Sequence, residues 1–236
     1  MASELKLAKD SAWLKLHELP KELSTQFREK FSELFALHPS ERGVVIMPIS
    51  ADTVDTNTRE NKQKNKDYIC KRWFQSYLNT PKWNPELKTS YMFSGMNPKE
   101  QPDLPDDFRK VLDWLNSQST VQYNQVVANW YLDGSDYIPF HSDYEYNAVP
   151  GSGVVVVNLT QDDTITRKFV LKPKMREFQN ACIDDQPTNV ELELFHGRII
   201  EMHGDTQKLY RHGVPPISAE LGNPGPRISL TFRAFQ

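Results

Sequence analysis

The feature that most limits how this chain can fold is a series of short strand-like segments in its second half. Turn-forming residues separate six of them: 126–132, 153–159, 167–171, 190–194, 199–202 and 227–235. Residues 190–194 alternate apolar and acidic side chains, as in a strand with one face in solvent, whereas Val154 to Val157 form an apolar run typical of a strand covered on both faces. Many short strands with few helices between them predict a mainly β fold with flanking helices, an antiparallel sandwich or jelly roll.

The first third of the chain has a different pattern. Apolar residues recur at helical spacing over residues 11–38, with a break at Pro20, and again over residues 106–116, so we expect helices in both places. Residues 50–67 are polar and show no periodicity, which predicts a loop. We therefore divide the chain into an N-terminal helical extension with a polar loop, residues 1–67, and a β-rich domain, residues 68–236.

Length and composition narrow the class of protein. At 236 residues the chain is long enough for one large domain with a well-buried core. Its two cysteines, Cys70 and Cys182, provide neither a disulfide framework nor a four-cysteine zinc site, and they suit a reducing compartment. The first ten residues lack the apolar core of a signal peptide, and no apolar run is long enough to span a membrane. We expect a monomer in the cytoplasm or nucleus that is not bound to a membrane.

Net charge and the local distribution of charge point to different conclusions about whether the protein binds nucleic acid. The net charge of −3 argues against a basic field over the whole surface, of the kind that coats DNA non-specifically. Basic residues are nevertheless concentrated between Arg59 and Arg72, where six of them accompany two acidic residues. This run is either a solvated loop or a local patch that contacts phosphates, and charge alone does not decide between the two.

His141-Ser142-Asp143 is the candidate metal-binding motif. Side chains two residues apart in an extended segment point to the same side, so one imidazole and one carboxylate can reach a single ion. A second histidine would complete a facial triad, which leaves open positions on iron(II) for dioxygen and a bidentate cosubstrate. Periodicity does not choose among the three downstream histidines, although the first two fit ordinary turn or strand-end positions: His196, His203 and His212.

The expected C-terminal strand carries polar side chains on one face and apolar ones on the other. Arg227 and Arg233 both lie on the polar face, and buried guanidinium groups need acidic partners. A small dicarboxylate between them would meet that need, because guanidinium groups bind carboxylates through paired hydrogen bonds. The strand expected before the metal-binding motif adds Asn129 and Tyr131 on one face, where an amide and a phenol can also bind carboxylates. A surface strand with two solvated arginines is the alternative.

In order and spacing, these motifs resemble the signature of the AlkB family of iron(II)- and 2-oxoglutarate-dependent dioxygenases. The main matching motifs are Asn129-x-Tyr131, His141-x-Asp143-x-Glu145, Tyr210-x-His212-x-Val214-Pro215 and Arg227-x-Ser229-x-Thr231-x-Arg233. Two further segments are similar to segments of the family's nucleic-acid-dealkylating members, namely Tyr91-Met92-Phe93-Ser94-Gly95 and Leu194-Phe195-His196-Gly197. The resemblance covers about residues 68–236.

The resemblance implies a double-stranded β-helix, or jelly roll, with helices bracing one sheet. Three residues would bind Fe(2+): His141, Asp143 and His212. Five would bind 2-oxoglutarate, with dioxygen as the other cosubstrate: Asn129, Tyr131, Arg227, Thr231 and Arg233. Residues 68–95 would form a substrate lid that carries Tyr91 and Phe93, and Glu145 would read an exocyclic nitrogen of the target base.

The activity that the resemblance implies is oxidative demethylation of N-alkylated bases in DNA or RNA, as in DNA repair. Because a methylated base is buried in a duplex, the enzyme would act on single strands or on a flipped nucleotide. The main alternative is an oxygenase with the same cofactors that acts on a protein, lipid or small molecule, and the near-neutral charge favours it. An idle nucleic-acid-binding module would not need all three ligands, and a cupin-like sugar or metal binder would not need both arginines.

Some residues depart from the family pattern. Ser229 stands where dealkylating members typically carry asparagine, and the segment 172–189 is longer and more polar than in compact members. Residues 1–60 resemble no segment of the family. These departures affect the identity of the substrate more than that of the cofactors.

Overall fold

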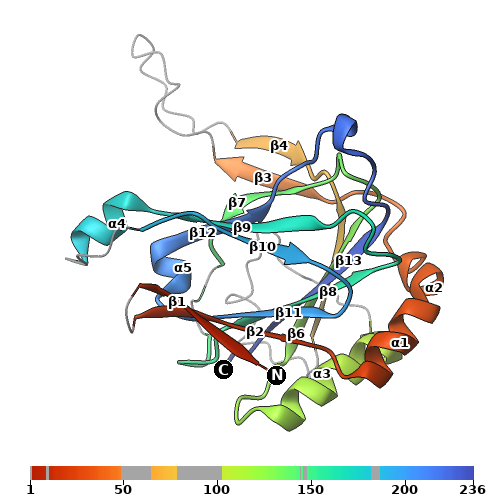
Figure 1. Ribbon diagram of the computed structural model, residues 1–236, viewed down its shortest axis with the longest axis horizontal. Coiled ribbons are helices and arrows are strands. Elements are labelled where there is room, and N and C mark those ends of the chain that lie inside the picture. Colours follow the sequence, from red (N-terminus) through yellow and green to blue (C-terminus); the bar gives the residue numbers. More distant parts are fainter. Residues whose placement is uncertain are drawn as a thin grey trace.

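The computed structural model describes residues 2–8, 11–48, 65–78, 103–143, 145, 148–181 and 187–236. Over these residues the chain forms two stacked antiparallel sheets, and helices cover the outer face of the larger one (Figure 1). The expected fold class, mainly β with flanking helices, is confirmed. No helix in the described part of the chain has the length and apolar composition needed to cross a membrane.

The larger sheet has the strand order β1-β2-β11-β8-β13-β6-β5. Its strands are β1 Ser3–Ala8, β2 Ala12–Glu18, β5 Trp73–Leu78, β6 Gln125–Tyr131, β8 Val154–Thr160, β11 Arg198–Gly204 and β13 Arg227–Arg233. Strands β6, β8 and β13 are buried at every position. The reason is that helices pack on one face of these central strands and the smaller sheet packs on the other.

The smaller sheet has the strand order β10-β9-β12-β7. Its strands are β7 Ile138–His141, β9 Arg167–Pro173, β10 Val190–Leu194 and β12 Tyr210–Val214. A separate two-stranded ribbon, at the top of the view in Figure 1, consists of β3 Val44–Pro48 and β4 Asn65–Ile69. Three short helical segments lie in the connections between strands: α4 Met175–Asn180, α5 Thr206–Leu209 and the 3-10 helix η3 Ala219–Leu221.

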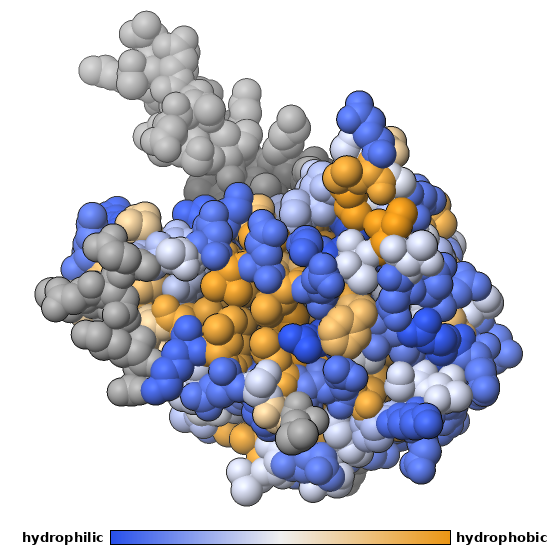
Figure 2. Space-filling model, in the orientation of Figure 1, coloured by the Kyte–Doolittle hydropathy of each residue, from blue (hydrophilic) through white to orange (hydrophobic). Residues whose placement is uncertain are grey.

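Apolar side chains of the two sheets pack against each other to form one core. Its members include Leu14, Leu16, Val154, Val156, Phe169, Leu171, Ile200 and Met202. Partly buried residues of the edge strands extend this core toward the surface: Leu5, Leu7, Val190 and Leu192. Figure 2 shows apolar side chains gathered on the face in view, between the two sheets. Apolar packing therefore holds the two sheets together on the side of the molecule that Figure 2 shows.

A second core lies between the larger sheet and three helices, α1 Lys21–Glu29, α2 Phe31–Phe35 and α3 Asp106–Gln118. A proline stands immediately before α1 and before α3, where its fixed φ and missing N–H suit the start of a helix. The apolar stripes of these helices cover the even-numbered residues of β13, such as Leu230. The Trp130 Nε1–H donates to the Leu34 carbonyl at 3.0 Å, which fastens α2 to β6.

The helix expected over residues 11–18 is wrong, because these residues form β2 between β1 and β11. Leu14 and Leu16 face the core between the sheets, while Lys15 is exposed, so the true period is two. The aromatic ring of Trp13 hid this alternation in the sequence. The Trp13 ring lies on the other face of the larger sheet from Leu14 and Leu16. There it stacks on the ring of His203, with ring centroids 5.7 Å apart.

Part of the segment expected to form a lid is also sheet. Residues 73–78 are β5, paired with β6 at the edge of the larger sheet, and Phe74 and Tyr77 are buried. These two side chains therefore belong to the core and not to a substrate-facing surface. Tyr91 and Phe93 lie outside the described residues, so the lid they would form stays a prediction.

Glu201 of β11 lies among basic side chains on the outer face of the larger sheet. Its carboxylate contacts the His17 Nε2 at 2.5 Å, the His203 Nε2 at 2.8 Å and the Lys15 Nζ at 3.2 Å. Burial by itself would raise the pKa of Glu201, but hydrogen bonds from the two histidines and the charge of Lys15 hold that pKa below its ordinary value. The cluster ties β2 to β11.

We expect Glu201→Gln to lower the free energy of unfolding at pH 7 by about 1–3 kcal/mol, since charge-assisted hydrogen bonds of a buried group are lost. A carboxyl group whose pKa is depressed by folding stabilises the protein above its unfolded-state pKa. That stabilisation is lost as the pH falls through this value toward the folded-state pKa. Denaturant unfolding should therefore show a difference between the two proteins at pH 7 that shrinks below the ordinary glutamate pKa of 4.5. An undiminished difference at low pH would contradict this role.

Candidate active site

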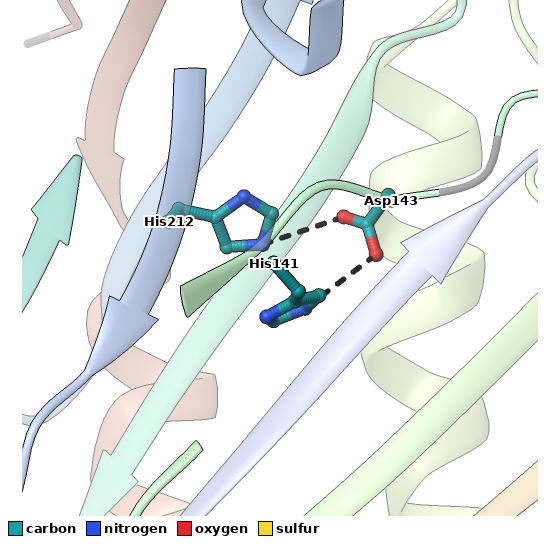
Figure 3. Close-up of side chains that lie close together, drawn as sticks. All are labelled: His141, Asp143 and His212. Atoms are coloured by element: carbon teal, nitrogen blue, oxygen red, sulfur yellow. Dashed lines mark ion pairs between the residues drawn. The ribbon is translucent and has the colours of Figure 1, made fainter. Parts of the chain in front are cut away.

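His141, Asp143 and His212 come together at the edge of the smaller sheet. The register of β7 and β12 pairs His141 directly with His212, and Asp143 follows two residues after His141. The three potential ligand atoms lie within 4.8 Å of one another. The His212 Nε2 is 3.5 Å from one carboxylate oxygen of Asp143, and the His141 Nε2 is 3.9 Å from the other (Figure 3).

A glycine lets the two histidine-bearing strands approach. A Cβ atom on Gly213 would lie 2.9 Å from the Ile138 carbonyl oxygen, and other backbone atoms of β7 lie almost as close. Backbone cannot move aside as a flexible side chain can, so this position of β12 requires glycine. The pairing register also shifts between His212 and Val214, next to this contact.

The donor set fits iron(II). The Nδ1–H of His141 donates to the Pro139 carbonyl at 2.8 Å, because a carbonyl only accepts, and this leaves Nε2 free to bind a metal. Burial lowers the pKa of His212 to about 3 and also lowers the pKa of His141, so both rings are neutral at pH 7, the form that binds metals. The Oδ2 of Asp143 is buried without a hydrogen-bond partner in the described residues. A cation at the common point would satisfy it.

The loop that carries Asp143 is held in place by several contacts. Burial by itself would raise the pKa of Asp143, but the guanidinium of Arg233, which pairs with Oδ1, holds it below its ordinary value together with the two histidines. The backbone N–H of Asp143 donates to the Gln207 Oε1 at 2.9 Å, and the Ser142 hydroxyl donates to the Tyr210 carbonyl at 2.7 Å. The carboxylate therefore keeps its orientation without help from a metal.

A cavity between the sheets extends from these three residues along β13 and β6. The odd-numbered residues of both strands line it: Val127, Asn129, Tyr131, Arg227, Ser229, Thr231 and Arg233. The alternate residues of the same strands, such as Trp130 and Ile228, pack under the helices. The predicted division of both strands into a polar and an apolar face is therefore confirmed, and the polar face is turned inward.

Arg227 lines this cavity as a buried guanidinium group. Its side chain lies 3.8 Å over the ring of Tyr131, and its Nη1 donates to the Asn158 Oδ1 at 3.0 Å. Its Nε and Nη2 are buried and have no hydrogen-bond partner in the described residues. Burial lowers the pKa of Arg227. A buried charge without an acidic partner is destabilising. An anionic ligand in the cavity would therefore stabilise the Arg227 guanidinium.

Comparison with known proteins agrees with this arrangement. A profile of the 2OG-Fe(II) oxygenase superfamily matches residues 50–233. The chain belongs to this superfamily. Membership implies Fe(2+) and 2-oxoglutarate, the two groups for which the His-Asp-His cluster and the inward-facing cavity provide suitable partners.

Three relatives show where in the superfamily this oxygenase is placed. It is 29% identical over 144 residues to human DNA oxidative demethylase ALKBH2, covering 61% of this chain and 51% of that protein. The Arabidopsis thaliana protein of the same name is 31% identical over 162 residues, covering 61% and 49%. Mouse alpha-ketoglutarate-dependent dioxygenase alkB homolog 3 is 28% identical over 151 residues, covering 64% and 49%. The oxygenase spans about half the length of these relatives, and its resemblance to the AlkB family is confirmed.

Two histidines that sequence patterns left as alternatives serve elsewhere in the oxygenase. The Nε2–H of His203 donates to the Glu201 carboxylate at 2.8 Å on the outer face of the larger sheet. The ring nitrogens of His196 lie 2.7 Å from the Thr160 carbonyl and 2.8 Å from the Ser24 carbonyl. Of the three candidates, only His212 joins His141 and Asp143.

Three residues of the site were not singled out from sequence for the places they occupy. The Nε–H of Arg72 donates to the Asn129 Oδ1 at 2.8 Å, so the amide NH2 of Asn129 is left to face the cavity. Asn158 contacts Arg227, and Gln207 contacts the backbone of Asp143. Each acts across 57 or more residues of chain, so no local pattern could have revealed it.

Glu145 lies just beyond the candidate metal ligands His141 and Asp143 in the sequence. Burial raises its pKa, as do the nearby charges of Asp143 and Asp205, while Lys174 acts in the opposite direction. The residue borders a second cavity, which is also lined by Arg233. Its predicted role in reading a target base stays a prediction.

Proposed function

We propose that this chain is an Fe(II)/2-oxoglutarate-dependent dioxygenase that oxidatively demethylates N-alkylated bases in DNA or RNA. The observation that carries the proposal is the His141–Asp143–His212 cluster beside a cavity lined by Arg227, whose buried Nε and Nη2 have no hydrogen-bond partner in the described residues. The relatives named as DNA oxidative demethylases support the substrate class. We further propose that the protein works inside the cell as a monomer on single strands or flipped nucleotides.

In this proposal His141, Asp143 and His212 hold Fe(2+), and the cavity holds 2-oxoglutarate. The Nε and Nη2 atoms of Arg227 lie on one edge of the guanidinium, so they can bind both oxygens of a carboxylate. Further hydrogen bonds to the cosubstrate would come from residues that line the same cavity: Asn129, Tyr131, Thr231 and Arg233.

When bound, iron and 2-oxoglutarate supply the oxidation of an N-alkyl carbon by dioxygen, with succinate, carbon dioxide and an aldehyde as products. The chain's own contribution is orientation. Arg233 and Gln207 fix the Asp143 loop, and Arg72 fixes which end of the Asn129 amide meets the cosubstrate. His141 is about one-third exposed, which marks the side from which substrate reaches the metal. Glu145, just beyond it, would accept a hydrogen bond from the exocyclic nitrogen of the base.

The deciding experiment supplies the protein with Fe(II), 2-oxoglutarate and single-stranded oligonucleotides that carry one base methylated at a ring nitrogen. DNA and RNA versions and unmethylated controls are compared. We expect succinate formation that depends on the methylated oligonucleotide, together with loss of the methyl group by mass spectrometry. Succinate formation at an equal rate without any oligonucleotide, and with the methyl group retained, would reject the proposed substrate. It would favour an oxygenase for a protein, lipid or small molecule, with which the net charge of −3 agrees.

A further inference from the structure

Two basic side chains face each other on the outer surface of the smaller sheet. The strand register pairs Lys172 of β9 with Arg211 of β12, and both side chains are exposed. Like charges directly opposite each other on neighbouring strands are destabilising. No ion pair joins either residue to an acidic side chain within the described part of the chain. By contrast Lys168, on the same face of β9, lies opposite Glu193 and pairs with it at 3.1 Å.

A third basic residue extends this pair toward the metal centre. Arg211 and Lys174 are close enough that the charge of Arg211 lowers the pKa of Lys174, though burial lowers it more. Lys174 in turn interacts with Glu145, which lies two residues beyond Asp143. Its Nζ also donates to the backbone carbonyl of Gln207 at 2.9 Å. We call Lys172, Lys174 and Arg211 the basic cluster.

The basic cluster adjoins the strands that carry the metal ligands. Arg211 immediately precedes His212, and its side chain points outward where that of His212 points inward. The Nζ of Lys172 lies 4.1 Å over the ring of Phe140, the residue before His141. Positive charge and a partly buried aromatic ring thus lie next in sequence to two of the candidate metal ligands, His141 and His212.

We propose that the basic cluster binds backbone phosphates of a single-stranded polynucleotide, on the nucleotides that flank the one entering the metal centre. The inference rests on the proposed function. It explains how a protein of net charge −3 can bind a negatively charged polymer. A phosphate between Lys172 and Arg211 would replace their mutual repulsion by two attractive contacts. Because the cluster is local, binding needs no basic field over the whole surface.

Charge reversal tests this inference through affinity and its salt dependence. We compare Lys172→Glu, Arg211→Glu and the double variant with Lys168→Glu, a matched control on the same sheet face. Binding of a fluorescein-labelled single-stranded oligonucleotide is followed by anisotropy over a series of salt concentrations. Each cluster variant should bind on the order of tenfold more weakly at low salt, and the double variant should lose about 1.4 from the slope of log K against log[salt]. The control should bind like the wild type.

Thermal stability separates a binding role from a structural one. Lys172→Glu places opposite charges across the strands, so its melting temperature should equal or exceed that of the wild type, whereas Lys168→Glu sets two acids against each other and should lower it. A lower melting temperature for Lys172→Glu with unchanged oligonucleotide affinity would overturn the inference. So would competition by polyglutamate of equal charge as strong as that by the oligonucleotide, since the partner would then be an acidic protein segment.

The outcomes also distinguish this inference from the proposed function. Demethylation by the wild type, with equal oligonucleotide affinity in the wild type and all four variants, would overturn the role of the basic cluster alone. Oligonucleotide binding that depends on the basic cluster, without demethylation, would support it and reject the proposed activity.

Discussion

We expect His212→Ala to abolish turnover and to weaken metal binding by more than about 100-fold, since loss of a residue that only hydrogen-bonds to a metal ligand already weakens metal sites 10–100-fold. The imidazole is the one candidate ligand that β12 contributes, and apart from His141 no other histidine of the described residues joins Asp143 in the cluster. Isothermal titration with Mn²⁺ under argon measures the metal affinity without relying on activity. His212→Gln is a second variant that keeps more of the side-chain volume beside Phe169, on which the His212 ring stacks with centroids 5.3 Å apart.

His203→Ala is the matched control for this prediction. It removes a partly buried strand histidine of the same region whose ring contacts Glu201 and Trp13 rather than the metal site. We expect it to lower the melting temperature while metal affinity and turnover stay near those of the wild type. Normal turnover in His212→Ala, with loss of turnover in His203→Ala, would show that the wrong histidine has been assigned.

Arg227→Met should raise the 2-oxoglutarate concentration needed for half-maximal turnover by at least about 100-fold. Two charge-assisted hydrogen bonds from Nε and Nη2 are lost, and each contributes roughly 1.5–3 kcal/mol. The substitution also has a signature without the cosubstrate. Removing a buried guanidinium whose Nε and Nη2 have no hydrogen-bond partner among the residues that the structure describes should leave the ligand-free melting temperature unchanged or higher. Adding 2-oxoglutarate should then raise the melting temperature of the wild type but not of the variant.

Arg167→Met provides the contrast, because Arg167 is also buried but both of its Nη groups are hydrogen-bonded to protein, and only its Nε has no partner in the described residues. Its Nη atoms donate to the carbonyl oxygens of Asp133, Asp136 and Pro215 at 2.7–3.1 Å. This variant should melt at a lower temperature, because three carbonyls lose a charged donor. Equal losses of 2-oxoglutarate affinity in Arg227→Met and Arg167→Met would mean that both arginines act through the fold, and would remove Arg227 from the cosubstrate site.

Local alternation in the sequence was enough to predict the sheet strands that form the site. In β13 and β6 the side-chain period of two separates an apolar face, which meets the helices, from a polar face, which lines the cavity. The same rule placed His141 and Asp143 on one side of their segment. It failed at β2, where Trp13 is apolar yet lies on the outer face, because periodicity records polarity and not the identity of the packing partner.

Only the tertiary structure decided which distant residues meet. The family resemblance implied His212 where periodicity left three histidines open, and the structure shows why: strand register sets His212 opposite His141, while His196 and His203 contact groups elsewhere in the fold. Register depends on contacts between segments far apart in the chain, and the sequence around each histidine carries no record of it. The same holds for Lys172 and Arg211. Neither basic residue stands out within its own strand, and only the pairing of the two strands shows that their charges lie opposite each other.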